Sequence, residues 1–184
     1  MPRGKPEAIS LGPGYLYIAV LGTTEPTDLT TPWASVSANW IHLGYTTEGS
    51  TFTYTPSAES VVVAEELDPV ARALTGREFK MEFALAQLTA TNLKVAMNGG
   101  TITAGSGIVT FEPPDLGEEL RTMLGWESED HQERWVLRRC LQTGASSIGR
   151  RKGADRAAIG VSFDLEKPSG AKPFKAILSS PTRL

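Results

Sequence analysis

The chain has few of the residues that metal-binding and disulfide-bonded proteins depend on. It contains one cysteine, Cys140, and two histidines, His42 and His131. A single cysteine excludes an intrachain disulfide and any structural zinc site built from several thiolates. The two histidines are far apart in the sequence, and neither has a second histidine at the spacing of a metal-binding motif. The sequence therefore predicts no metal site and no cofactor.

Long hydrophobic runs and a strong excess of one charge are also missing. No segment approaches the ~20 apolar residues that a helix needs to cross a bilayer. The apolar stretch at residues 16–21 is too short for a secretory signal. The formal net charge of −3 argues against a general nucleic-acid-binding surface. We expect a single soluble domain made in the cytoplasm.

Catalytic motifs are scarce as well. The chain has neither a G-x-S-x-G nucleophile turn nor a G-x-x-x-x-G-K-[ST] phosphate loop. Cys140 alternates with Arg138, which indicates a half-buried strand residue rather than a nucleophile. Carboxylates are plentiful, as at Glu118 and Glu119, but such loop clusters are usually solvated. We predict no enzyme activity, and a hydrolase built on these carboxylates stays a minor alternative.

Alternation of apolar and polar residues with a period of two is abundant in the sequence. Clear examples lie at residues 51–55, 79–85, 135–141 and 159–165. About eight such strands and one helix predict a mainly β fold, either a β-sandwich or a partly rolled barrel. Residues 1–13 are predicted to form an arm, 14–178 the β domain, and 179–184 a tail. Residues 22–39, rich in Thr, Pro and Ser, predict a long loop.

A long hairpin and a short helix are the most distinctive predicted elements. The hairpin covers about residues 50–86 and has a protruding connection at about 65–77. The helix covers about residues 89–98, with Thr89 as its N-cap and Asn98-Gly99-Gly100 at its end.

Three stretches together resemble one protein family, the major tail tube proteins of long-tailed phages. Residues 16–26, LYIAVLGTTEP, resemble the opening strand and loop of these proteins. Residues 43–49, LGYTTEG, resemble the turn that enters their long hairpin. The most specific series is LDPV at 67–70, LTGR at 74–77, FALA at 83–86 and TATNLK at 89–94. The order of these segments is similar to that in tail tube proteins from phages of actinobacteria. The resemblance covers about residues 14–100.

The resemblance implies a structural role rather than catalysis. Proteins of this family form six-membered rings whose inner sheets join around a channel, and the rings stack into a tube. The implied partners are further copies of the chain, the tape measure protein and genomic DNA in the channel, and the tail terminator and tail tip proteins. The implied location is the virion tail, assembled in the host cytoplasm.

The same resemblance assigns candidate residues to two surfaces. The hairpin connection is expected to contact the next ring, and the polar side of the long strands to face the channel. The ring-to-ring candidates are Glu65, Glu66, Leu67, Asp68, Val70, Leu74 and Arg77, and the channel candidates are Thr53, Lys80 and Glu82. A disordered loop at 22–39 is a hypothesis for how premature assembly is delayed.

Two alternatives stay open at the level of sequence. A tail terminator or the tube of a contractile device is expected to share the fold. A carbohydrate-binding β-sandwich is the other, with tryptophan side chains as platforms for sugar rings. The residues available for it are Trp33, Trp40, Trp126 and Trp135.

Overall fold

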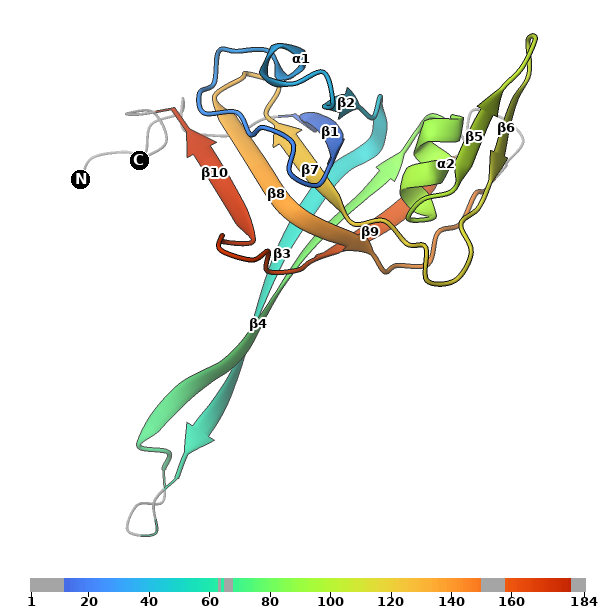
Figure 1. Cartoon of the computed structure of the whole chain (residues 1–184). Helices are drawn as coiled ribbons and strands as arrows, with labels where there is room; N and C mark the ends of the chain where they lie inside the picture. Colours follow the sequence, from blue (N-terminus) through green and yellow to red (C-terminus); the bar gives the residue numbers. More distant parts are fainter. Residues whose placement is uncertain (1–11, 63, 65–67, 150–157, 180–184) are drawn as a thin grey trace.

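The computed structural model describes residues 12–62, 64, 68–149 and 158–179, and in this part of the chain ten strands and two short helices are present (Figure 1). The strands are β1 (Tyr15–Val20), β2 (Ile41–His42), β3 (Thr46–Val61), β4 (Ala71–Leu85), β5 (Thr101–Ala104), β6 (Val109–Glu112), β7 (Thr122–Glu127), β8 (Glu133–Gln142), β9 (Ile159–Leu165) and β10 (Phe174–Leu178). The helices are α1 (Trp33–Val36) and α2 (Ala90–Ala96). The predicted mainly β fold is confirmed.

Eight of the strands form one sheet that divides into two layers at β8. The strand order is β2-β1-β7-β8-β9-β4-β3, and β10 also pairs with β8. Strand β7 occupies one edge of β8, so β10 and β9 share the other: β10 pairs with residues 133–137 and β9 with residues 140–142. The chain therefore forms an open, partly rolled sandwich, while β5 and β6 form a separate two-stranded sheet.

The main core lies between the two layers. Alternation turns Met81, Phe83 and Leu85 of β4 inward, as the sequence predicts. The phenyl rings of Phe83 and Phe163 stack with centroids 5.8 Å apart. The buried members of this core are Leu16, Ile18, Leu43, Met81, Phe83, Leu85, Val95, Ala96, Leu124, Leu137, Cys140, Ile159, Val161 and Phe163.

A second core lies on the outer face of β1, β7 and β8, where the sequence predicts only a loop. Trp33 and Trp40 are buried there against Ala19, Met123 and Val136. Their indole rings meet edge to face with centroids 4.7 Å apart. We call residues 21–40 the outer cover. The predicted disorder of 22–39 is wrong, because two large apolar side chains anchor this segment to the sheet.

Strand β7 is the element that the sequence pattern missed. It lies within residues 113–133, a region without a recognisable motif, yet it is central between β1 and β8. Both faces of β7 are covered, since Leu124 belongs to the main core and Met123 to the second core. A strand buried on both faces does not alternate apolar with polar residues.

Helix α2 begins and ends where the sequence predicts, to within two residues. The Thr89 hydroxyl accepts a hydrogen bond from the Asn92 amide at 3.1 Å. After the helix, Asn98 has a left-handed φ of 55°. Its side chain exchanges two hydrogen bonds with the backbone of Gln142, at 2.6 and 2.9 Å. The end of the helix is thereby tied to β8.

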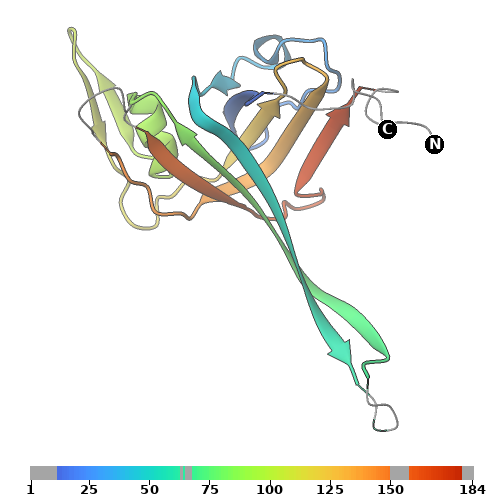
Figure 2. The same ribbon diagram turned by 180° about the vertical axis from the view of Figure 1, so that it is seen from behind.

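The β3–β4 hairpin projects far from the sandwich (Figure 2). Pairing between the strands continues from Phe83 out to Val61 and Ala71, with a β-bulge between Ser57 and Ala58. The predicted connection at 65–77 is therefore too long, because residues 71–77 belong to β4. We call residues 54–61 and 71–79, which pair only with each other, the ribbon.

Candidate assembly surfaces

The face of the sheet that is turned away from the main core is polar across β3, β4 and β9. Thr53 lies opposite Lys80, and Lys80 lies opposite Asp164. The ammonium of Lys80 is 3.8 Å from a carboxylate oxygen of Asp164, and both side chains are nearly half exposed. The Ser162 hydroxyl donates to Glu82 Oε1 at 3.1 Å. The three channel candidates, Thr53, Lys80 and Glu82, thus share one face, which we call the polar face.

Carboxylates outnumber cations on the polar face. Glu78, Glu82 and Asp164 stand there with only Lys80 to oppose them among the described residues of these three strands. Exposed charges at this spacing interact weakly in water, so their sum matters more than any single pair. The result is a weakly acidic surface, and an open pocket of about 510 Å³ lies on it, with Lys80, Glu82 and Ser162 among its lining residues.

The other face of the hairpin carries aromatic side chains that attach it to the second layer. Phe52 on β3 and Phe79 on β4 each place their ring 5.3 Å from that of Phe174 on β10. The Trp135 ring stacks on Phe174 at 5.3 Å and meets Phe52 at 5.0 Å. Such aromatic contacts contribute about 0.5–1.5 kcal/mol each beyond the burial of area. They hold the base of the hairpin at a defined angle to the sandwich.

Beyond this anchor, the ribbon is exposed on both faces. Strand β9 pairs with β4 only from Lys80 to Leu85, so among the described strands β3 alone pairs with residues 71–79. At about 3.4 Å per residue, this unsupported part reaches about 30 Å from the body. A two-stranded ribbon alone in water is marginally stable. Its exposure therefore points to a partner surface in an assembly.

The ring-to-ring candidates that the structure describes lie on this ribbon or just before β4. Leu74 is 72% exposed and Val70 is 53% exposed. The Arg77 guanidinium lies over the Phe79 ring, 5.5 Å from its centroid. Asp68 is exposed just before β4. The candidates Glu65, Glu66 and Leu67 lie outside the described residues.

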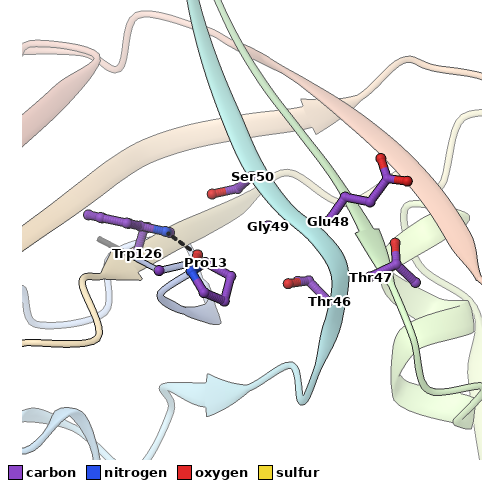
Figure 3. Close-up of a pocket in the computed structure, with 8 residues that line it drawn as sticks. Pro13, Thr46, Thr47, Glu48, Gly49, Ser50 and Trp126 are labelled. Atoms are coloured by element: carbon purple, nitrogen blue, oxygen red, sulfur yellow. Dashed lines mark hydrogen bonds between the residues drawn. The ribbon is translucent and has the colours of Figure 1, made fainter. Parts of the chain in front are cut away.

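The outer edge of β3 is the end of the main sheet, and a shallow pocket of about 410 Å³ adjoins it (Figure 3). Pro13 faces this edge from the N-terminal side, where its carbonyl accepts a hydrogen bond from the Trp126 indole at 3.2 Å. Gly49 has a φ of 82° at the irregular start of β3, and a Cβ there would come within 3.4 Å of Pro13. Among the described residues that line the pocket, Glu48 is the one with an ionisable side chain. A lone carboxylate gives the pocket no acid–base pair, so its main feature is a strand edge open to pairing.

The outer cover is attached by a buried ion pair that the sequence gives no local sign of. The Arg134 guanidinium donates to Glu127 Oε1 through Nε and Nη2, at 2.9 and 2.7 Å. Its Nη1 donates to the carbonyls of Asp28 and Thr31, at 3.0 and 2.7 Å. The Trp33 indole donates to Glu127 Oε2 at 2.9 Å. One carboxylate and one guanidinium, both buried, thus join the cover to the sheet.

Two ionisable groups in the cover region are perturbed by this packing. Burial, followed by the nearby Glu127 carboxylate, raises the pKa of Tyr17 to about 12. The Tyr17 ring stacks on Trp33 with centroids 4.6 Å apart. Hydrogen bonds from the Thr31 amide and hydroxyl and from the Thr30 amide lower the pKa of the Asp28 carboxyl to about 2. Both shifts are explained by structural contacts of the cover.

Burial makes Cys140 and two of the four tryptophans inaccessible, which weakens the carbohydrate-binding and cysteine-based alternatives. Trp33 and Trp40 are 2% and 4% exposed, so neither indole face is available to a sugar ring. Trp126 and Trp135 are half-buried at the boundary of the main core. Burial strongly raises the pKa of the Cys140 thiol, which therefore stays protonated and unreactive.

Chemistry-bearing clusters are not found in the part of the chain that the structure describes. His131 contacts Glu127 at 2.9 Å, but that carboxylate is also held by Arg134 and by the Trp33 indole, so the group is a structural network. No group of three His, Cys, Asp or Glu residues suited to a metal ion occurs among the described residues. No described helix is long and apolar enough to span a membrane.

These surfaces define a class: a structural β protein with an open sheet edge and a projecting ribbon, suited to self-association. Over residues 2–181 the sequence matches the family model described as phage tail tube protein. The chain therefore belongs to the phage tail tube protein family, and it is a structural subunit that self-associates into the tube of a virion tail.

Comparison with solved structures gives matches of low overall similarity, two of which are described here. The chain is similar to Hcp1 from Salmonella typhimurium at 10% sequence identity and a TM-score of 0.33, covering 89% of this chain and 93% of that one. It is also similar to a chain of the virion of the native gene transfer agent particle, at 11% identity and a TM-score of 0.33, covering 87% and 95%. No curated protein sequence matches significantly.

Proposed function

We propose that the subunit forms six-membered rings that stack into a hollow tube, and that it acts without catalysis. Family membership supports the tube, and the ring symmetry is carried over from the resemblance of residues 14–100. The observation that carries the proposal is the ribbon. It is exposed in the monomer, where it adds no stability, and an assembly can bury it. Negative-stain electron microscopy of the purified protein at rising concentration tests it. Hollow tubes with six-fold end views are expected, and closed rings of another symmetry would contradict the hexamer.

In this proposal the polar face lines the channel. Its support is the acidic balance of the face together with the lack, among the described residues of β3, β4 and β9 on this face, of exposed aromatic side chains that would stack on bases. Six copies of a chain with net charge −3 carry roughly −18 per ring, which repels DNA phosphates and favours passage over binding. The proposed contents of the channel are the tape measure protein and genomic DNA. The tail terminator and tail tip proteins are the proposed partners at the two ends.

The channel assignment can be tested with a single cysteine. Thr53→Cys places a thiol on the polar face, and the native Cys140 is fully buried and silent. In tubes, a small maleimide is expected to label this thiol while a maleimide attached to a bulky polymer is not. In the monomer, both reagents are expected to label it. Equal labelling by the bulky reagent in tubes and monomers would place this face outside the channel.

The ring-to-ring contact is proposed to be made by the distal ribbon, by which we mean the described residues within 59–77. Reversing both charges, with Asp68→Arg and Arg77→Glu, is expected to impair tube growth and leave the fold intact. Circular dichroism and the unfolding midpoint serve as the control for the fold. Tubes of normal length from this variant would count against the assignment.

A further inference from the structure

A second exposed apolar surface lies on the body of the molecule, in the part of the sandwich that carries β1, β2, α2 and β5 (Figure 1). It is a groove of about 320 Å³ whose floor contains Ile18 and Val95, both buried. Its rim is apolar and unusually exposed for a single chain. The exposed rim residues are Val20, Ile41, Ile102 and Leu120, which are 63%, 51%, 37% and 50% accessible.

One cation lines this apolar groove. Lys94 lies in the last turn of α2, and the described residues give it no ion-pair partner. The groove therefore suits a segment that combines aliphatic side chains with a carboxylate.

The distal ribbon of the same chain has this composition. Val61, Val62, Val70 and Leu74 are exposed aliphatic side chains, between 44% and 72% accessible. Two carboxylates, Glu59 and Asp68, accompany them and are also exposed. The main-chain bond from the Val70 amide to the Val61 carbonyl, 3.0 Å long, holds the two strand ends together.

The ribbon cannot reach the groove of its own chain. It leads away from the body, with α2 and β5 on the far side of the sandwich from its tip (Figures 1 and 2). Two different surfaces that complement each other on one chain make a heterologous contact, and such a contact propagates from copy to copy.

We propose that the groove between β1, β2, α2 and β5 receives the distal ribbon of a second copy of this chain. Aliphatic side chains at the distal end of the ribbon, Leu74 among them, fill the groove, and Lys94 pairs with a ribbon carboxylate. This inference rests on the proposed function, since it names the surface that the ribbon meets on the neighbouring ring. It adds a receptor site to a contact for which only one side had been assigned.

Disulfide trapping tests the contact directly. The double variant Leu74→Cys with Ile102→Cys places one thiol on the ribbon and one on the rim of the groove, while Cys140 stays buried. Mild oxidation of assembled protein is expected to give a ladder of covalent multimers on a non-reducing gel. Two controls, each single variant and Leu74→Cys with Lys167→Cys, are expected to give at most dimers, because exposed Lys167 does not line the groove.

The outcomes separate this inference from the proposed function. Tubes without a specific ladder would overturn the docking and leave the proposed tube standing. A specific ladder without tubes would support the docking and contradict the stacked rings, and the loss of both would contradict both.

A charge exchange gives a second, independent readout. Lys94→Glu is expected to lower the extent of assembly at least tenfold, and Lys94→Glu combined with Asp68→Lys to restore part of it. Lys167→Glu is the matched control, expected to assemble normally. Assembly of Lys94→Glu at the wild-type level would overturn the role of Lys94.

Discussion

The buried pair Glu127–Arg134 makes the strongest quantitative prediction about this fold. Glu127→Ala removes the carboxylate that accepts three hydrogen bonds from Arg134 and Trp33, at 2.7–2.9 Å. The guanidinium then stays buried without its counter-ion, which typically costs about 3–5 kcal/mol. The indole N–H also loses its acceptor, a further cost of about 1–3 kcal/mol when no water replaces it.

These two costs are not simply additive. Arg134 keeps its bonds to the carbonyls of Asp28 and Thr31, and the smaller alanine leaves room for water. We expect a loss of about 4 kcal/mol in the free energy of unfolding. That is a large part of the roughly 5–15 kcal/mol that stabilises a typical domain.

Urea unfolding of the monomer, followed by tryptophan fluorescence, measures this loss. With a slope of about 2 kcal/mol per molar urea, the midpoint is expected to fall by about 2 M. Glu112→Ala, at an exposed carboxylate, is the control and is expected to change stability by less than about 0.5 kcal/mol. Limited proteolysis should also cut the outer cover sooner in Glu127→Ala. A loss below about 1 kcal/mol would refute the reasoning, because the pair would then not be desolvated as described.

Three further predictions follow from particular contacts. Gly125→Ala would place a Cβ 2.5 Å from a ring carbon of buried Trp33, so we expect a loss of about 1–3 kcal/mol in urea unfolding, and an unchanged midpoint would show that the cover can shift. Because the folded pKa of Asp28 is depressed to about 2, its stabilising contribution is complete above pH 4 and is lost as the pH falls toward 2. Asp28→Asn should therefore flatten the fall of the thermal midpoint over that pH range, and an unchanged pH profile would contradict the assignment. Amides of residues 71–79 should exchange with solvent faster than those of residues 80–85 in the monomer and become protected in tubes, and equal rates in both states would argue against ribbon docking.

The parts of the fold that sequence reasoning predicts well are those with one polar and one buried face. In β4, inward Met81, Phe83 and Leu85 alternate with outward Lys80 and Glu82, and the structure has this arrangement. The N-cap of α2 is equally predictable, because Thr89 bonds to a backbone amide only three residues away. In both cases the signal lies within a few residues.

The outer cover and β7 could not be predicted, because their determinants are distant in sequence. Glu25 binds Arg138 across 113 residues, and Trp33 binds Glu127 across 94 residues. A segment rich in Thr, Pro and Ser gives no sign that two tryptophans within it will be buried. Strand β7 lacks alternation because the outer cover buries its outer face. A prediction that misses the cover therefore also misses β7.

Because the outer cover is ordered, a barrier to premature assembly would have to lie in another part of the molecule. Since the cover is already packed in the single chain, its folding cannot delay tube growth. The ribbon is the better candidate, because a two-stranded hairpin without a third strand is marginally stable until a partner surface orders it. In the proposed assembly, one ribbon entering one groove would gain little beyond that ordering cost, whereas a completed ring would present several grooves in fixed positions at once. Effective concentration then favours addition to an existing ring over association of free subunits, so growth would start from a preformed ring.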